Sequence, residues 1–347
     1  MKKVIIIIIS IGILVFGFFG VKKYLNKNDK STSDDAPKEV KKLKIINEDS
    51  KSRPIAVMIN NNHDAWPHAG LNKSYINYEI IAEGGITRIM ALFKDQKDVE
   101  KIGSVRSSRP YFLDYVLEND AIYVHWGGSN DAYNDIYSLG INNLDGMSYE
   151  GKYFFRDKTL NKSLEHTGFT KMSMINEGIS KLGYNTETNK KNLFNYSIDE
   201  LDFSNKENAL IADEVIIPYS SYHTTSYKYD EANKVYLRYM SDTPHVDSIT
   251  GEQYIAKNII TYKINNYSYD SYGRQKLENI GEGEGYYITD GYAIPITWKK
   301  DTRASQTRYY YKNTEEEIKL NDGNTWIQIE PSNKYLDIIS NNETTEE

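Results

Sequence analysis

The stretch from Glu83 to Ser129 limits the possible folds of this chain more than any other part of its sequence. Ile86 to Phe93 is rich in Ile, Leu, Met and Phe, which is typical of a buried β-strand. Ala121 to Val124 is a second run of this kind. Polar side chains that chemistry can use lie at the edges of these runs, where loops carry function; they are Glu83, Arg88, Arg106, Arg109, His125 and Ser129. The sequence therefore predicts the place of a functional site more clearly than its chemistry.

The region from residue 53 to residue 190 is predicted to form a mixed α/β domain. Its expected strands alternate with expected helices, a pattern typical of layered α/β folds. Pro110 suits the first turn of a helix that runs to about Leu117, and Gly183 suits the end of another helix. The other expected elements are a strand at Ile55 to Ile59, a helix from Asn130 or Asp131 to Leu139, and a helix from Met172 to Leu182.

The region from residue 205 to residue 335 is predicted to form a mostly antiparallel β domain, so that the chain as a whole has an α+β fold. Asp-Gly turn signals at Asp290-Gly291 and Asp322-Gly323 separate several short apolar runs. Residues 336–347 are predicted to be an acidic, frayed tail. The expected strands are Val215 to Ile217, Tyr227 to Tyr229, Val235 to Tyr239, Ile255 to Ile264, Tyr286 to Ile288, Ala293 to Trp298, Thr307 to Tyr311 and Thr325 to Ile329.

The amino-terminal segment, residues 1–23, is predicted to be a membrane anchor. Val4 to Val21 carries no charge, and as a helix at ~1.5 Å per residue it would be about 27 Å long, enough to cross a bilayer core. A cleaved signal peptide is the alternative, but the end of the run lacks the small-x-small pattern of a cleavage site. Residues 24–52 are polar and are predicted to be a flexible linker. We therefore expect a single-pass protein of the cell membrane with its globular part outside the cytoplasm.

The composition excludes several classes of site. The chain has no cysteine, which excludes disulfides, thiolate metal sites, a cysteine nucleophile and a cysteine-linked lipid anchor. The formal net charge of −7 argues against a nucleic-acid partner. The 30 tyrosines fit either an AT-rich genome or an aromatic surface that stacks on sugar rings.

The segment Arg106-Ser107-Ser108-Arg109 is a candidate anion site. Guanidinium groups bind phosphate or carboxylate through two parallel hydrogen bonds, and a helix start directly after them adds free N–H groups. Arg88 adds a third positive charge if its strand lies next to this segment. The alternative is an internal network in which the arginines pair with Glu83, Glu118 or Asp114.

The segment from His125 to Ser129 is the candidate for catalysis. A histidine at the end of a strand can serve as general acid or base, and Glu83 is the other candidate for that role. Gly127 would let a ligand approach the backbone closely, and Ser129 is a further ligand-binding candidate. Because no G-x-S-x-G pattern surrounds Ser129, a serine nucleophile is poorly supported. The alternative is a histidine that is hydrogen-bonded within a turn.

Two other segments mix metal-ligand residue types but predict no metal site. Asn60 to His68 holds two histidines and an aspartate, and Asp242 to Asp247 holds one histidine and two aspartates. Neither spacing matches a known ligand pattern. Gly281 to Gly285 lacks the Lys and Ser/Thr of a phosphate loop and is expected to be a bent β connection. No cofactor is predicted.

Six segments in the same order resemble one bacterial family, the YerB-like lipoproteins of Gram-positive bacteria, which carry a domain of unknown function in two parts. They are E-G-G-I-T-R-I-M-A-L-F, I-G-S-V-R-S-S-R-P-Y, Y-V-H-W-G-G-S, H-V-D-S-I-T-G, G-Y-Y-I-T-D-G and N-T-W-I-Q-I. The resemblance covers roughly residues 53–331. It implies a two-part extracytoplasmic protein held at the membrane, and it supplies no established activity. The chain departs from the family in lacking the cysteine of a lipid anchor.

Two functional hypotheses remain open. The first is an accessory protein of the cell envelope that binds a cell-wall glycan, an anionic polymer or a protein partner. The second is a cell-wall-directed enzyme, a phosphotransferase or hydrolase, in which Arg106 and Arg109 bind the anion and His125 or Glu83 is the acid or base. Arginines near strand ends are similar to those of the LytR-CpsA-Psr phosphotransferases, but that likeness is an analogy. The enzyme hypothesis requires Glu83, Arg106, Arg109 and His125 to converge within ~10 Å.

Overall fold

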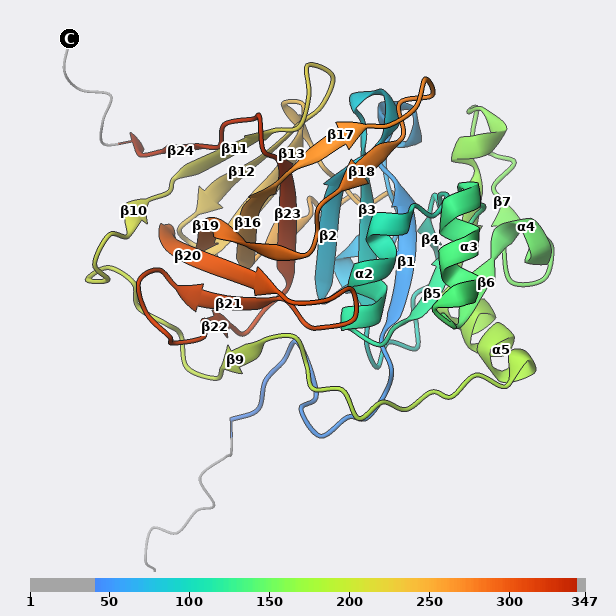
Figure 1. The fold of residues 1–347 in the computed structure, drawn as a ribbon, viewed down its shortest axis with the longest axis horizontal. Helices are drawn as coiled ribbons and strands as arrows, with labels where there is room; N and C mark the ends of the chain where they lie inside the picture. Colours follow the sequence, from blue (N-terminus) through green and yellow to red (C-terminus); the bar gives the residue numbers. More distant parts are fainter. Residues whose placement is uncertain (1–40, 342–347) are drawn as a thin grey trace, which may run out of the picture. The chain divides into compact units, whose positions relative to one another are not determined.

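A large sheet is the central element of the computed structural model, which describes residues 41–341. Its strand order is β10-β20-β19-β16-β23-β2-β3-β1-β5-β6, with β21 paired to β20 (Figure 1). The strands are β1 (Ile55–Asn60), β2 (Ile76–Ile81), β3 (Thr87–Phe93), β5 (Ile122–His125), β6 (Asn143–Asp145), β10 (Leu210–Ile211), β16 (Asn258–Ile264), β19 (Gly281–Thr289), β20 (Tyr292–Lys300), β21 (Arg308–Tyr311) and β23 (Thr325–Pro331).

A second sheet has the order β14-β13-β12-β11-β24, with β15 paired to β13. Its strands are β11 (Glu214–Pro218), β12 (Thr224–Asp230), β13 (Val235–Met240), β14 (Thr243–Pro244), β15 (Ile255–Ala256) and β24 (Asp337–Ile339). Short pairings join β4 (Ile102–Gly103), β8 (Gly168–Thr170) and β7 (Phe155–Arg156), β9 (Asn195–Ser197) and β22 (Lys319–Asn321), and β17 (Asn266–Ser268) and β18 (Gln275–Leu277). The α-helices are α2 (Pro110–Glu118), α3 (Asn130–Ser138), α4 (Gly146–Tyr149) and α5 (Met172–Leu182).

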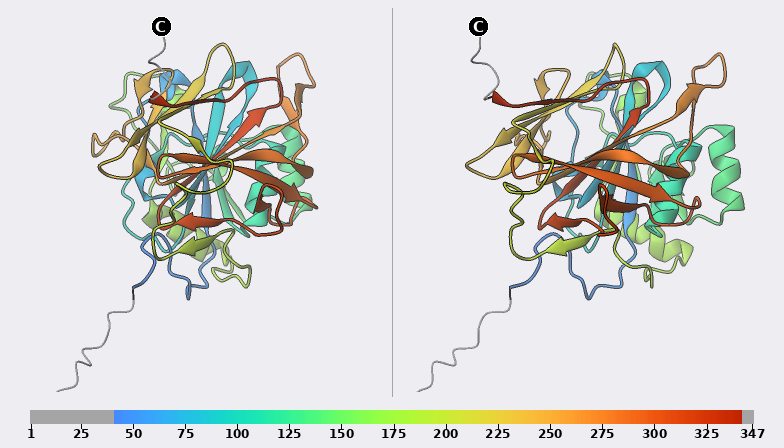
Figure 2. Two further views of the ribbon diagram at one scale, coloured as in Figure 1. Left: turned by 90° about the vertical axis from the view of Figure 1, so that its left-hand side faces the viewer. Right: turned by 60° about the vertical axis from the view of Figure 1, so that its left-hand side comes forward.

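The large sheet is buried on both faces. Successive side chains of a strand point to opposite faces, so β1 gives Ala56 and Met58 to one core and Val57 and Ile59 to the other. Helix α2 packs in the first core, whereas α5 and the second sheet pack in the second core. The turned views in Figure 2 show the second sheet and α2 on different sides of the large sheet. Such double coverage explains the nearly continuous apolar runs of β1 and β3.

Strands from the two predicted domains are joined in the large sheet. β2 lies parallel to β23, with Ile76 opposite Thr325 and Ile80 opposite Ile329. Residues 43–341 accordingly belong to one compact unit. The regions 53–190 and 205–335 are thus distinct in sequence but share one sheet and both cores. The sequence analysis did not anticipate β2, because buried Asn77 and Glu79 interrupt its apolar pattern.

Strands predominate over helices in both regions, so the mixed α/β character predicted for residues 53–190 holds only in part. The three predicted helices of that region are confirmed as α2, α3 and α5. The predicted Asp290-Gly291 turn joins β19 to β20, and both residues have the positive φ that such a turn requires. Gly281 to Gly285 begins β19 and forms part of a strand.

The membrane helix stays a prediction. Within residues 41–341, no helix is long and apolar enough to span a membrane. The predicted anchor at residues 1–23 and the first part of the predicted linker, residues 24–40, lie outside the described residues.

The ends of the folded unit differ from those predicted. Residues 43–52 were assigned to the flexible linker, yet Ile46 is buried in a core, and the Lys44 and Ile45 N–H groups bond to Asp322. Apolar side chains at Leu43, Ile45 and Ile46 explain why this part packs. At the other end, residues 337–339 of the predicted tail form β24, which pairs with β11. Residues 342–347 lie outside the described residues.

Candidate functional site

Glu83, Arg88 and Arg109 lie together where β3 begins and α2 begins. Glu83 is in the 3-10 turn Glu83–Gly85 before β3, Arg88 is the second residue of β3, and Arg109 directly precedes α2. Glu83 Oε2 accepts a hydrogen bond from Arg88 Nη2 at 2.9 Å, and Glu83 Oε1 accepts one from Arg109 Nε. All three side chains are buried. This geometry favours the internal network over an open anion site, because a carboxylate of the chain occupies the place of the anion.

The charges of this cluster explain its pKa directions. Burial by itself raises the pKa of Glu83, but Arg88 and Arg109 outweigh it and hold that pKa below its ordinary value. Burial and the charge of Arg109 lower the pKa of Arg88 to about 10. The two guanidinium groups also donate to backbone carbonyls, Arg88 to Ser107 at 2.8 Å and Arg109 to Ser108 at 2.7 Å. The carboxylate and the carbonyls together hold both arginines in place.

Arg106 and Ser107 have other partners. Arg106 Nη2 lies 2.5 Å from Glu165 Oε2, and the side chains are 25% and 51% exposed. An ion pair exposed to this degree contributes little to stability. Ser107 Oγ donates to the Trp126 carbonyl at 3.1 Å. Arg106 and Arg109, which the sequence analysis placed in one anion site, therefore pair with two different carboxylates, Glu165 and Glu83.

The contacts of His125, Gly127 and Ser129 lie within the fold: a hydrogen-bonded ring, a turn and a helix cap. The His125 ring is fully buried, with Nδ1 2.8 Å from the Gly127 carbonyl and Nε2 3.1 Å from Asn143 Oδ1. Gly127 adopts a positive φ of 80°, which suits glycine at this turn. Ser129 is the N-cap of α3, and its Oγ accepts from Ala132 N. With both ring nitrogens bonded, His125 matches the alternative of a turn histidine.

The two histidine-bearing loops, which the sequence analysis treated separately, meet in the interior. His68 Nδ1 lies 2.6 Å from His245 Nε2, and His68 Nε2 lies 2.7 Å from the Asn60 carbonyl. The other nitrogen of His245 is bonded to Arg238, which pairs with Glu79. Among the described residues, no group of three or more His, Cys, Asp or Glu could hold a metal ion. The loops thus belong to a buried polar network around Glu79.

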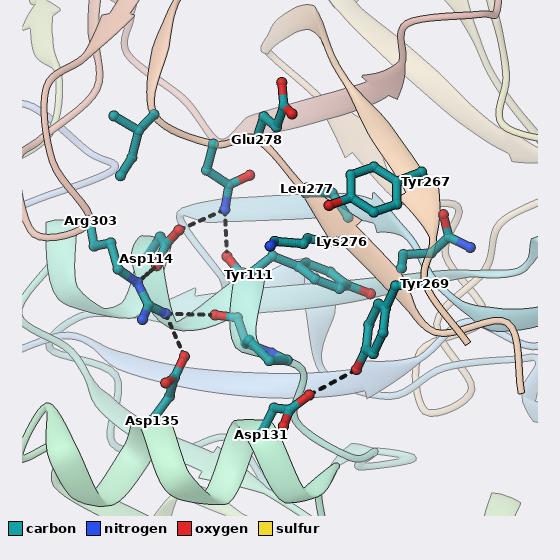
Figure 3. A pocket seen from close by; sticks show the side chains of 14 residues that line it. Tyr111, Asp114, Asp131, Asp135, Tyr267, Tyr269, Lys276, Leu277, Glu278 and Arg303 are labelled. Atoms are coloured by element: carbon teal, nitrogen blue, oxygen red, sulfur yellow. Dashed lines mark hydrogen bonds and ion pairs between the residues drawn. The ribbon is translucent and has the colours of Figure 1, made fainter.

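An open pocket of about 660 Å³ lies beside α2 and α3, under the β17–β18 hairpin (Figure 3). Its volume is in the range of small-molecule sites. Buried and half-buried groups form a fixed floor. Arg303 bonds to Asp114 at 2.5 Å and to Asp135 at 2.8 Å, and Asn279 Nδ2 donates to Asp114 at 2.9 Å. Because these side chains bond to one another, the floor is organised without a ligand.

The rim of the pocket carries flat rings and exposed polar groups. Tyr267 and Tyr269 on the hairpin are 48% and 42% exposed, and Tyr269 donates to Asp131 on α3 at 3.0 Å. Lys276 on β18 and Glu278 directly after this strand are both exposed. The lining carboxylates are Asp114, Asp131, Asp135 and Glu278, against the cations Lys276 and Arg303. This surplus of negative charge favours a neutral or cationic ligand with hydroxyl groups over an anion.

None of these pocket residues was singled out from the sequence. One signal was available, since N-N-Y-S-Y-D-S-Y-G-R at residues 265–274 places three tyrosines in a polar turn segment. Such a segment is typical of an exposed aromatic hairpin. The sequence carries no comparable signal for Asp131, Asp135 and Arg303, because their place in the pocket depends on tertiary contacts.

Comparisons with known proteins place the chain in a family. Residues 43–185 match the N-terminal domain and residues 215–327 the C-terminal domain of a protein family of unknown function, DUF3048. The chain is 28% identical over 292 residues to the "Putative lipoprotein YerB" of Bacillus subtilis (strain 168), covering 83% of this chain and 84% of that protein. The crystal structure of YerB from Bacillus subtilis superimposes with a TM-score of 0.72 at 26% identity, covering 83% of this chain and 94% of that one. With both domains matched in order, the chain belongs to the YerB-like family.

Proposed function

We propose that this chain is an extracytoplasmic, membrane-held accessory protein of the cell envelope that binds a glycan in the pocket under the β17–β18 hairpin. The location is supported by the uncharged Val4 to Val21 run and by the similarity to a protein named as a lipoprotein. Because the chain has no cysteine, a membrane helix would replace lipid attachment.

The observation that carries the ligand class is the pairing of exposed tyrosine rings with carboxylates in one pocket. The faces of Tyr267 and Tyr269 offer flat apolar surface, and sugar rings have apolar faces that stack on such rings. Asp131 and Glu278 are acceptors for sugar hydroxyl groups. Of the two ligand classes expected from the sequence, an anionic polymer is disfavoured here by the four lining carboxylates. A neutral or amino-sugar glycan fits better.

Binding of the full chain in detergent to purified cell-wall glycan tests this proposal. The variant Tyr267→Ala/Tyr269→Ala should bind about ten-fold or more weakly, since each ring contributes roughly 0.5–1.5 kcal/mol beyond its buried area. Tyr137→Ala is the matched control, because Tyr137 is 89% exposed on α3 and does not line the pocket. Equal binding by wild type and the double variant would remove the pocket from the proposal. Stronger binding to polymers rich in phosphate than to glycan freed of phosphate would restore the anionic class.

A further inference from the structure

A second pocket, separate from the first, contains a buried carboxyl group with one oxygen that has no hydrogen-bond partner among the described residues. Glu330 is near the end of β23 and is 1% exposed. Its Oε1 accepts a hydrogen bond from the Thr261 hydroxyl on the neighbouring strand β16. Its Oε2 is buried and has no hydrogen-bond partner among the residues that the structure describes. Buried carboxyl oxygens are rarely left in this state, so an unpartnered one in a pocket indicates a missing donor.

The pocket around Glu330 has a volume of about 480 Å³ and lies between β16, β19 and the segment before β24. It shares no lining residue with the pocket under the β17–β18 hairpin. Tyr286, Pro295 and Leu336 give it apolar walls. A ligand here would place an apolar body against these walls and its polar head at Glu330.

The other charged groups of this pocket already have partners. Lys312 Nζ pairs with Glu284 Oε2 at 2.7 Å at the exposed rim. Lys263 Nζ lies 5.0 Å from the centre of the Tyr335 ring, in the geometry of a cation–π contact. The lining charges of Lys263 and Lys312 balance those of Glu284 and Glu330 when Glu330 is ionised. Glu330 is therefore the charged group of the pocket that is buried and has an oxygen without a hydrogen-bond partner among the described residues.

We infer that this pocket binds a ligand that carries a primary ammonium group on a short apolar body, with the Glu330 carboxylate receiving the ammonium. An ammonium donor makes a charge-assisted bond to a carboxylate, about twice as strong as the neutral bond that a hydroxyl donor would make. An anionic head would face two carboxylates, Glu284 and Glu330, and would leave Oε2 without a donor. The ammonium group is the feature that the site recognises, whether it belongs to a free metabolite or to a larger molecule.

Binding is coupled to the ionisation of Glu330. Burial raises the pKa of Glu330 to about 7, and the charge of Lys263 counters this only in part. The other charged and titratable groups that line the pocket are Tyr262 and Lys263 from β16, Glu284 and Tyr286 from β19, Lys312, and Tyr335 before β24. The other acid of the pocket, Glu284, is exposed at the rim. The carboxyl is mostly protonated at pH 5.5 and mostly ionised at pH 8, so affinity for an ammonium head should rise about ten-fold or more across this interval.

The test compares three four-carbon probes that carry different head groups: butylamine, butanol and butyrate. The full chain, labelled with 13C at glutamate carboxyl carbons, is titrated with each probe at pH 5.5 and pH 8, and the Glu330 signal is assigned by Glu330→Gln. We expect butylamine at pH 8 to shift the Glu330 signal to that of an ionised carboxylate, with weaker binding at pH 5.5. Butanol and butyrate should bind at least about ten-fold more weakly. Equal binding of butanol and butylamine, or no pH dependence, would overturn the inference.

Variants give an independent reading of the same site. Glu330→Gln keeps the shape of the side chain and should abolish the butylamine effect on the neighbouring Thr261 amide signal. Glu284→Gln, at the rim of the same pocket, is the matched control and should bind butylamine within about two-fold of wild type because Glu284 already pairs with Lys312. If Glu330→Gln fails to fold, the relative affinities of the wild type for the three probes at the two pH values, which need no signal assignment, still decide the question. Loss of binding in Glu284→Gln but not in Glu330→Gln would place the ammonium at the rim and overturn the assignment.

Discussion

Glu79 and Glu330 are two fully buried carboxyl groups on neighbouring strands of the large sheet, and they differ in their partners. Glu79 on β2 lies opposite Gln328 on β23, and Glu330 is two residues further on, so both side chains point to the same face. Glu79 Oε2 pairs with Arg238 Nη2 at 2.5 Å, and its oxygens also accept from groups of Asn61, Thr87, His223 and Thr225. Within residues 41–341, Glu330 has one hydrogen-bond partner, the Thr261 hydroxyl.

This difference shows that the partners of a buried carboxyl group indicate whether it stabilises the fold or belongs to a candidate binding site. Burial raises the pKa of both groups, but Arg238 and the hydrogen bonds to His223 and Thr87 reverse the effect for Glu79 and hold its pKa far below the ordinary value. No comparable partner acts on Glu330, whose pKa rises to about 7. A buried carboxylate with a complete set of partners, such as Glu79, stabilises the fold. An incomplete set inside a pocket leaves bonding capacity for a ligand.

The largest expected effect comes from cutting the chain between its two regions. The Glu79 and Arg238 ion pair joins β2 to β13, and β2 pairs with β23, so a fragment of residues 53–190 would lose both contacts. We expect this fragment alone to be unfolded, as measured by circular dichroism and by the dispersion of its amide NMR signals. Adding a 205–341 fragment should restore structure if the two parts can associate. A cooperative thermal transition of the 53–190 fragment alone would show that it has a sufficient core of its own.

Breaking the Glu79 pair within the whole chain is the next largest change. Arg238→Met should lower the free energy of unfolding by about 3–5 kcal/mol, because it leaves a buried carboxylate without its counter-charge. Lys312→Met removes the rim pair with Glu284 and serves as the control, with an expected loss of at most ~1 kcal/mol. Urea unfolding at pH 7 measures both. A loss in Arg238→Met no larger than in the control would mean that the hydrogen bonds of Glu79 suffice without the arginine.

At Glu330, in contrast, removal of the charge is expected to increase the free energy of unfolding. Its pKa is raised in the folded state from 4.5 to about 7, so protonation stabilises the folded chain and this stability is lost as pH rises through 7. Glu330→Gln, which carries no charge at any pH, should therefore be more stable than wild type by about 2–3 kcal/mol at pH 8. The advantage should shrink towards pH 5. Thermal unfolding at the two pH values is the measurement, and an advantage that does not change with pH would exclude ionisation as its cause.

The sequence predicted the elements whose pattern is local. α2 follows from Pro110 at its start and α5 from apolar residues at helical spacing with Gly183 behind them. β2 was missed because Asn77 and Glu79 are polar and are buried by partners distant in the sequence, among them Arg238. The sequence left two alternatives open for the arginines, an anion site or pairing with Glu83, Glu118 or Asp114, because whether they meet a ligand or a carboxylate of the chain depends on tertiary geometry. The missing partner of Glu330 is likewise invisible in the sequence, because it is a property of the space around the side chain.

The smallest expected effect is a partial cancellation in mild acid between two buried histidines and Glu330. Burial lowers the pKa of His68 to about 4, and it also lowers the pKa of His245 below its ordinary value. The unfolded chain then binds more protons below pH 6.5, so each of these two histidines should remove about 1 kcal/mol of stability between pH 7 and pH 5.5. Protonation of Glu330 should add a similar amount over the same interval.

We therefore expect the free energy of unfolding of the wild type to fall less between pH 7 and pH 5.5 than that of Glu330→Gln, since the histidine and Glu330 contributions oppose each other. In Glu330→Gln the opposing contribution is gone, and stability should fall by about 2 kcal/mol or more over the same interval, because the pKa values of His63 and His166 are lowered as well. Glu284→Gln, which alters an exposed carboxylate, should follow the wild type. Urea unfolding of the three proteins at the two pH values provides the comparison. If Glu330→Gln and wild type have the same slope, the Glu330 carboxyl already has a partner in solution, and the contrast with Glu79 is lost.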